Sequence, residues 1–169
     1  MKTVLAITCL VVGLTLAGCK KYDTPSQGPG IVARLPQPDM PLPDNAYKAQ
    51  LVLAEPLSKL SPGQKQEIKV RVTNKSDALW IVYGTEGLKY RVAVGDSWLD
   101  NKGQLLTSMD ARIGLPANLN PGESVVVPLL ITAPAKPGDY ILQLDLVQEL
   151  VTWFADKGSE TLKVNVKVE

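Results

Sequence analysis

The sequence has 169 residues, with 18 lysines and arginines, 17 aspartates and glutamates, and no histidine. This length fits one domain with short attachments, because domains of roughly 100–200 residues usually share a single hydrophobic core. The net charge of +1 argues against a nucleic-acid-binding protein, which needs a surplus of basic residues to neutralise phosphates. The lack of histidine excludes the Ser-His-Asp and Cys-His nucleophile systems and every zinc site with a histidine ligand.

Residues 1–18 have the pattern of a secretory signal peptide. A positive start at Lys2 is followed by an apolar run from Thr3 to Gly18 that ends in small residues. The run has 16 residues, whereas a helix that crosses the hydrocarbon core of a bilayer needs roughly 20. We therefore expect this segment to be removed rather than to span a membrane.

The tetrapeptide Leu16-Ala17-Gly18-Cys19 resembles the lipobox of bacterial lipoproteins. In that family the cysteine receives a diacylglyceryl thioether and becomes the acylated N-terminus after cleavage. The resemblance implies that Cys19 is lipidated, and that acyl chains such as palmitate hold the protein on a membrane of the cell envelope. Lys20 stands where an aspartate retains many lipoproteins at the inner membrane, which favours the outer membrane in a Gram-negative host. Cys9 is removed with the signal peptide, so an intramolecular disulfide is excluded.

Residues 19–46 are the lipidated cysteine and a proline-rich tether. Proline fixes φ and lacks a backbone donor, so we expect no long strand or helix here. The prolines are Pro25, Pro29, Pro36, Pro38, Pro41 and Pro43. A ligand for a proline-recognition domain is the alternative interpretation. The folded domain is then residues 47–169, whose 14 basic and 14 acidic side chains suit a soluble globular surface.

The domain shows a hydrophobic pattern of period two, which predicts half-buried strands. Apolar and polar side chains alternate over residues 67–73 and 162–168, and residues 140–146 carry an apolar row with Gln143 and Asp145 among the residues opposite. Residues 124–132 are nearly continuously apolar, which predicts a strand covered on both faces. Turn signals separate these runs, and about seven or eight strands in a chain of this length indicate an all-β sandwich.

Two details resemble an immunoglobulin-like β-sandwich. Tyr140 follows the turn residues Pro137-Gly138-Asp139. This position resembles that of the tyrosine near the start of strand F in immunoglobulin-like domains, whose hydroxyl bonds back across the corner. Trp80 lies ten residues after Val70, where the resemblance places the buried tryptophan of strand C. Leu142 stands where that fold carries a cysteine, so we expect the two sheets to be joined by packing without a disulfide. Tyr140 and Trp80 are thus assigned structural roles.

A longer set of turn, core and aromatic residues lies between Lys69 and Phe154. It comprises Val72-Thr73-Asn74, Trp80, Tyr90-Arg91, Trp98-Leu99-Asp100 with Gly103, Arg112, Leu115-Pro116, Leu119 with Pro121-Gly122-Glu123, Ala133-Pro134, Pro137-Gly138-Asp139-Tyr140, Leu146-Val147-Gln148-Glu149 and Trp153-Phe154. This set is similar to bacterial extracytoplasmic Ig-like domains of the four-tryptophan (FW) group. That resemblance implies a binding or accessory module, although this chain has three tryptophans.

The candidate binding surface is formed by Trp98, Trp153 and Phe154. Exposed on one face, these rings would stack on sugars or on the apolar side chains of a partner; the alternative is that they fill the core. Neighbours in a strand face opposite sides, so Trp153 and Phe154 cannot both enter the same core. We expect one of them to cover an edge or to contact a partner.

Charged residues offer two further candidates. Asp96, Asp100 and Asp110 cluster loosely, and carboxylate oxygens are ligands for calcium. Their spacing does not match the EF-hand loop, so we prefer a solvated turn over a calcium site. Glu149 is a candidate for a structural ion pair with Arg112 or Arg91. We predict no metal, no cofactor and no catalytic residue.

The sequence therefore predicts a lipid-anchored cell-envelope protein with a non-catalytic binding, assembly or accessory role. Its expected partners are the membrane, through the acyl chains, and an envelope protein, with no nucleic acid. A carbohydrate-binding module at the cell surface is the first alternative. A carboxylate-dependent hydrolase is the second, and it would need a pair of Asp or Glu side chains in a cleft.

Overall fold

The structure is a computed structural model that describes residues 40–82 and 88–169, without the side chains of residues 108–110. The predicted signal peptide, the lipidated Cys19 and most of the predicted tether lie outside the described residues. Within the described ranges, no helix has the length and apolar character needed to cross a membrane.

The described chain consists of β-strands joined by turns and two short 3₁₀ helices. In chain order the elements are η1 (Asp44–Ala46), β1 (Ala49–Leu53), β2 (Lys59–Leu60), β3 (Lys65–Asn74), β4 (Val92–Asp100), β5 (Leu105–Gly114), β6 (Ser124–Thr132), β7 (Gly138–Gln148), β8 (Thr152–Trp153), η2 (Ala155–Lys157) and β9 (Leu162–Val168).

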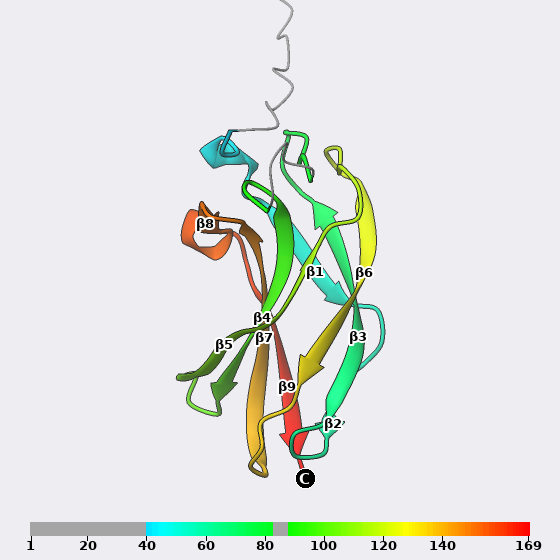
Figure 1. Ribbon diagram of the computed structural model, residues 1–169, viewed down its shortest axis with the longest axis vertical. Helices are drawn as coiled ribbons and strands as arrows, with labels where there is room; N and C mark the ends of the chain where they lie inside the picture. Colours follow the sequence, from blue (N-terminus) through cyan, green and yellow to red (C-terminus); the bar gives the residue numbers. More distant parts are fainter. Residues whose placement is uncertain (1–39, 83–87) are drawn as a thin grey trace, which may run out of the picture. The chain divides into compact units, whose positions relative to one another are not determined.

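The strands form two sheets that face each other (Figure 1). The smaller sheet has the order β1-β3-β6, and the larger sheet has the order β2-β9-β7-β4-β5 with β8 added beside β7. Within the described residues, all strand pairs are antiparallel except β2 with β9. Seven described strands have five or more residues, and β2 and β8 have two each. The predicted Ig-like β-sandwich is confirmed.

The core lies between the sheets and is built by alternating inward side chains. Ile68, Val70 and Val72 of β3 are buried, as are Leu142, Leu144 and Leu146 of β7. Full burial of one such side chain stabilises the fold by roughly 1.5–3 kcal/mol. The described residues contain no cysteine, so this packing joins the two sheets.

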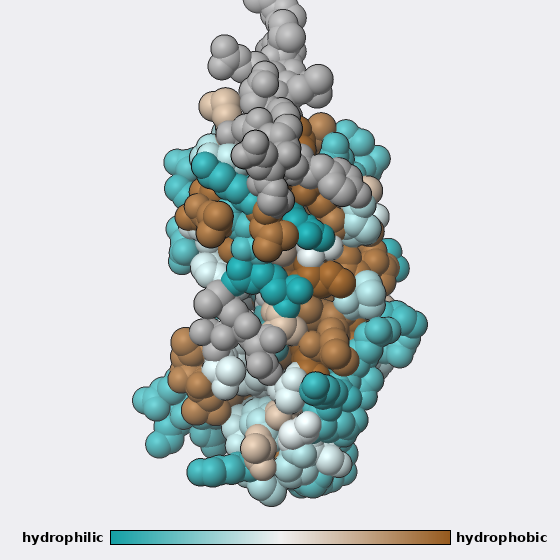
Figure 2. All heavy atoms as spheres, viewed as in Figure 1, coloured by the Kyte–Doolittle hydropathy of each residue, from teal (hydrophilic) through white to brown (hydrophobic). Residues whose placement is uncertain are grey.

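Strand β6 corrects the prediction of a strand covered on both faces. Val127, Leu129 and Ile131 are buried, whereas Val126 and Leu130 are 39% and 57% exposed. The prediction was wrong because the sandwich has only two layers, so one face of β6 packs against the core and the other meets water. Figure 2 shows such apolar side chains interrupted by hydrophilic ones on the face it presents, a normal feature of protein surfaces.

The strand-C tryptophan is Trp98, and the assignment to Trp80 is wrong. Trp98 lies in β4, is buried, and is the register partner of Leu142 in β7. Trp80 lies before β4, in an isolated bridge to Leu119. The spacing misled because β3 ends at Asn74 and β4 begins only at Val92, so Trp80 precedes the strand. Trp80 is nevertheless fully buried, and its indole N–H donates to the carbonyl of Ala46 at 2.9 Å.

The folded domain begins earlier than the predicted boundary at residue 47. Leu42 and Ala46 belong to the core, and the backbone N–H of Leu42 donates to Gln148 Oε1 at 3.0 Å. Pro41 and Pro43 on either side of Leu42 have no N–H that needs a partner, so this segment packs without joining a sheet. The predicted tether therefore ends before Leu42.

Tyr140 has the geometry expected from the sequence. Its hydroxyl donates to the carbonyl of Lys136, four residues upstream, at 2.9 Å. Its ring lies edge-on to Trp98, with the ring centroids 6.4 Å apart. The corner that leads into β7 is thus fixed to the strand-C tryptophan.

Candidate binding site on the outer face of the larger sheet

The structure separates the three aromatic residues of the predicted binding surface. Trp98 and Phe154 are buried, with 1% and 0% exposure, so the prediction that they form an exposed surface is wrong. Phe154 packs edge-on against Tyr47 and Trp80, at centroid distances of 5.0 and 5.2 Å. Both rings were misplaced because the sequence does not show which face of β4 Trp98 occupies or that Phe154 lies just after β8 and turns into the core. Trp153 alone of the three is half-buried.

Trp153 lies on the outer face of the larger sheet. Its strand β8 pairs with β7, where Trp153 is the register partner of Val147, so its side chain points away from Phe154. The ring rests on β4 above Gly95. A Cβ atom at Gly95 would come within 2.8 Å of Trp153 Cη2, which is closer than real contacts allow. Glycine at this position thus makes room for the indole.

The cation of an ion pair lies over the Trp153 ring. Arg112 Nη1 lies 2.7 Å from Glu149 Oε2, and the guanidinium carbon lies 5.2 Å from the indole centroid. This is the structural pair expected from the sequence with Arg112; Arg91 instead lies against Gly114. Because the Glu149 side chain is only 10% exposed, water screens the pair weakly, and the cation stays fixed near the ring.

A depression of about 290 Å³ opens beside Trp153. Its lining comes from β4, β5, β7, β8 and η2, and consists of Gly95, Ser97, Leu105, Gln143, Asp145, Trp153, Ala155 and Asp156. Register pairing places Gly95 beside Asp145 and Ser97 beside Gln143, so outward residues of two neighbouring strands form the floor. The depression combines one aromatic wall with several polar groups.

The polar side chains of this depression differ in whether they have hydrogen-bond partners within the protein. Asp145 Oδ1 accepts the N–H of Leu146 at 2.7 Å, and Oδ2 accepts the N–H of Ala155 at 3.2 Å. Burial raises the pKa of the Asp145 carboxyl to about 6, against the lowering effect of these two donors. Within the described part of the chain, the amide of Gln143 and the hydroxyl of Ser97 form no hydrogen bond. Both retain their capacity for a ligand.

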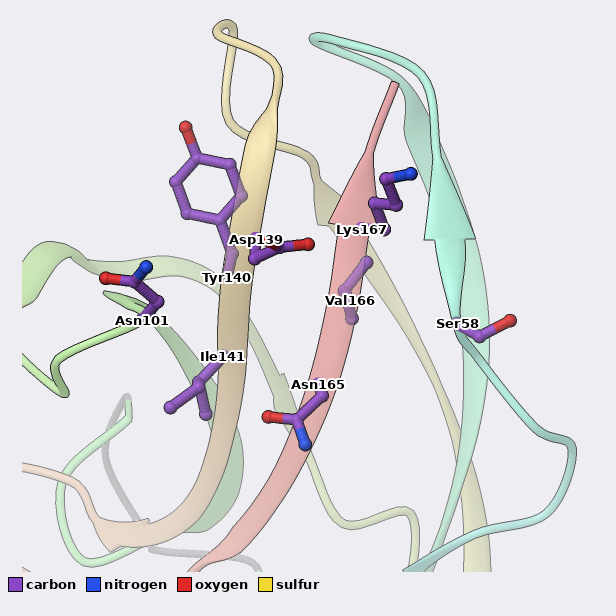
Figure 3. Close-up of a pocket in the computed structure, with 8 residues that line it drawn as sticks. All are labelled: Ser58, Asn101, Asp139, Tyr140, Ile141, Asn165, Val166 and Lys167. Atoms are coloured by element: carbon purple, nitrogen blue, oxygen red, sulfur yellow. The ribbon is translucent and has the colours of Figure 1, made fainter.

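A second depression, of about 370 Å³, lies on β7 and β9 near the C-terminus. Figure 3 shows its side chains spread along both strands, with Asn101 and Ser58 on opposite sides. Asp139, Asn165 and Lys167 are all exposed there. These polar groups are exposed and do not converge, and Lys167 is paired with Glu169, so the depression at Trp153 is the stronger candidate.

The aspartates considered for calcium have separate structural surroundings. Asp96 is buried and accepts the N–H of Ala111 at 2.6 Å, whereas Asp100 Oδ1 accepts the N–H groups of Lys102 and Gln104 in the β4–β5 turn. The side chain of Asp110 lies outside the description. Among the described residues, no group of three or more His, Cys, Asp or Glu side chains is placed to hold a metal ion.

No protein-family model and no curated protein matches the sequence. Among solved structures, the chain is similar to a CARDB domain from Pyrococcus furiosus, with 15% identity, a TM-score of 0.43, and coverage of 72% of this chain and 95% of that chain. A beta-glucosidase from Listeria innocua in complex with glucose is 15% identical, with a TM-score of 0.41, and the match covers 70% of this chain and 16% of that chain. The sporulation control protein Spo0M from Bacillus subtilis is 12% identical, with a TM-score of 0.40, and the match covers 72% of this chain and 49% of that chain. The matched segment is thus a small part of the glucosidase and about half of Spo0M, and these likenesses concern the fold alone.

Proposed function

We propose that this protein is a lipid-anchored protein of the bacterial cell envelope whose β-sandwich is a non-catalytic binding module. Cys19 is its proposed lipidation site, and Lys20 favours the outer membrane where the host has one. The ligand contacts the depression beside Trp153. The lipobox-like tetrapeptide supports the anchor, and the geometry of the larger sheet supports the binding role.

The observation that supports the binding role is that a fixed indole, Trp153, lies beside polar side chains that have no hydrogen-bond partner among the described residues. The edge of the indole rests on Gly95 and the Arg112 guanidinium lies over the ring, so little conformational freedom is lost when a ligand packs against it. Beside it, Gln143 and Ser97 have no hydrogen-bond partner among the described residues. A fixed aromatic side chain next to unused polar groups is the usual composition of a ligand contact.

The carboxylates of the depression support binding better than hydrolysis. Both oxygens of Asp145 accept backbone N–H groups, one from its own strand and one from the turn after β8. This carboxyl therefore anchors the start of η2, which directly follows the strand that carries Trp153. Asp156 is exposed and accepts a hydrogen bond from the Thr152 hydroxyl at 3.3 Å. Both carboxyls thus have local structural partners, in keeping with a non-catalytic module.

The anchor is tested by metabolic labelling with an alkyne fatty acid. Cys19→Ala is expected to abolish the label and to leave unprocessed or soluble protein, because the acyl acceptor is gone. Cys9→Ala is the matched control, and its label is expected to persist since this residue lies in the segment that is removed. Label on the Cys19→Ala protein would show that the lipobox interpretation is wrong.

The binding role is tested by retention of envelope components on the immobilised full-length protein. Wild type is expected to retain a stoichiometric component from solubilised envelopes, and Trp153→Ala is expected to lose at least 90% of it. Glu67→Ala, on the exposed outer face of the smaller sheet, is the matched control and is expected to retain the component. Equal retention by all three proteins, or none by wild type, would overturn the proposal.

A further inference from the structure

We infer that the depression beside Trp153 binds one ring of a neutral, hydroxyl-rich saccharide. The inference rests on the proposed binding function and names the ligand class of the same site. Trp153 supplies the stacking surface, and Gln143, Ser97 and the two aspartates supply the hydrogen bonds.

The stacking surface is preorganised. A pyranose has one face of C–H groups, and such faces pack on the π surface of tryptophan. The indole of Trp153 cannot sink further toward the sheet because it already rests on Gly95, and the Arg112–Glu149 pair limits its rotation. The depression of about 290 Å³ lies at the lower end of the size range of ligand pockets, roughly 300–1,000 Å³. This size fits a single ring, with further rings of a longer chain outside.

The hydrogen-bonding groups match a sugar better than an apolar anchor of a protein partner. The Gln143 amide and the Ser97 hydroxyl each provide both donors and acceptors, and the carboxylates of Asp145 and Asp156 provide acceptors. Sugar hydroxyls are donors and acceptors at once, so they satisfy Gln143 and Ser97 and also donate to the remaining lone pairs of the two carboxylates. An apolar anchor would bury Gln143 and Ser97 without partners, which is unfavourable.

Charge selects among saccharides. The described lining holds two carboxylates, Asp145 and Asp156, and no basic side chain. The nearby guanidinium of Arg112 is already paired with Glu149. An anionic sugar would therefore meet like charge without a counter-ion in the depression, whereas a neutral sugar meets only acceptors. We expect neutral pyranosides to bind and uronic acids to be rejected.

The experiment is saturation-transfer NMR on the purified full-length protein in a detergent without a sugar headgroup. The probes are glucose, galactose, mannose and N-acetylglucosamine, with glucuronate as the anionic counterpart. At least one neutral probe is expected to bind with a dissociation constant on the order of 1 mM, which is ordinary for one small, exposed ring. Its C–H protons are expected to carry the strongest transfer, because they face the indole. Glucuronate is expected to bind at least tenfold more weakly.

Variants locate the binding. Trp153→Ala and Gln143→Leu are each expected to weaken the neutral probe at least tenfold, Trp153→Phe less so, and Glu67→Ala not at all. Near-ultraviolet circular dichroism checks that each variant is folded. Binding unchanged in both Trp153→Ala and Gln143→Leu would overturn the assignment to this depression.

The saccharide inference and the proposed function fail separately. If no neutral probe binds, while envelope retention still depends on Trp153, the saccharide inference is overturned and the proposed function stands. If neither the probes nor an envelope component is retained, both are overturned.

Discussion

The two sheets of the sandwich present outer faces of different construction. On the smaller sheet, the charged residues Glu67, Lys69 and Arg71 of β3 lie opposite Leu130, Pro128 and Val126 of β6. Their aliphatic stems lie beside these apolar residues while their charged groups reach water. On the larger sheet, Gly95 and Gly114 leave space that Trp153 and Arg91 occupy.

The difference shows how a flat sheet acquires a binding site. In the middle of the smaller sheet, the outward positions of β3 carry the long charged side chains of Glu67, Lys69 and Arg71, and none of them is a glycine. On the larger sheet a glycine in β4 allows a tryptophan from another strand to lie across the sheet, and the polar residues beside it become the floor of a depression. Small residues in a strand interior are therefore the feature that separates the two faces.

The largest expected effect comes from removing the ring behind the site. Phe154→Ala is expected to lower the free energy of unfolding by about 3–5 kcal/mol, because it leaves a cavity beside Tyr47 and Trp80. Urea denaturation followed by circular dichroism measures this loss. Val126→Ala, on the outer face of the smaller sheet, is the control. A loss below about 1 kcal/mol for Phe154→Ala would show that the turn bearing Trp153 is independent of the core.

The next effect is a dependence of stability on pH. Burial raises the pKa of Asp145 from 3.8 to about 6, so the native protein holds this proton more tightly than the unfolded chain. The resulting stabilisation is present below about pH 4 and is lost as the pH rises through 6, by about 1–2 kcal/mol for a carboxyl that still meets water. Asp145→Asn, neutral at every pH, lacks this slope.

The measurement is the difference in unfolding free energy between wild type and Asp145→Asn. On going from about pH 4 to about pH 7, the difference is expected to shift by about 1–2 kcal/mol in favour of the variant. Other titrating groups cancel because both proteins share them. A difference that stays constant, or shifts toward wild type, would contradict the burial of this carboxyl.

The fold could be predicted from the sequence because apolar residues alternate with polar ones wherever one face of a strand is buried. Over residues 67–73 and 162–168 the apolar positions alternate, and one face of each strand is indeed buried. The pattern failed for β6, because Val126 and Leu130 on its outward face are apolar although they are exposed. It also failed for Leu42, because prolines on either side of a single apolar residue resemble a tether.

The site was predicted only in part. The adjacency of Trp153 and Phe154 correctly required one ring to leave the core, but nothing in the sequence identified which one. Gln143 and Asp145 were visible as polar residues opposite the apolar row of β7. Their meeting with Trp153 depends on the short strand β8, which has two residues and no periodicity. Gly95, inside a strand, was the available signal of a close approach.

A smaller effect is expected from closing the space at Gly95. Gly95→Val places a Cβ against Trp153, and the indole is expected to move off the sheet because it is the freer of the two groups. The net cost is about 1 kcal/mol, since overpacking is offset by the strand preference of valine. Acrylamide quenching of tryptophan fluorescence is expected to rise, because Trp80 and Trp98 are buried and Trp153 alone becomes more exposed. Glu67→Val, on the smaller sheet, is the control, and equal quenching in both variants would contradict the contact.

The smallest effect is expected on the outer face of the smaller sheet. Leu130 is 57% exposed on β6, so Leu130→Ser is expected to change the free energy of unfolding by less than about 0.5 kcal/mol. Leu129, its neighbour, is 1% exposed and points inward, so Leu129→Ser is expected to cost several-fold more in the same denaturation experiment. The pair compares two leucines that differ in the face they occupy. If Leu130→Ser costs as much as Leu129→Ser, the outer face of β6 is covered in solution, and the two faces of the sandwich differ less than their construction indicates.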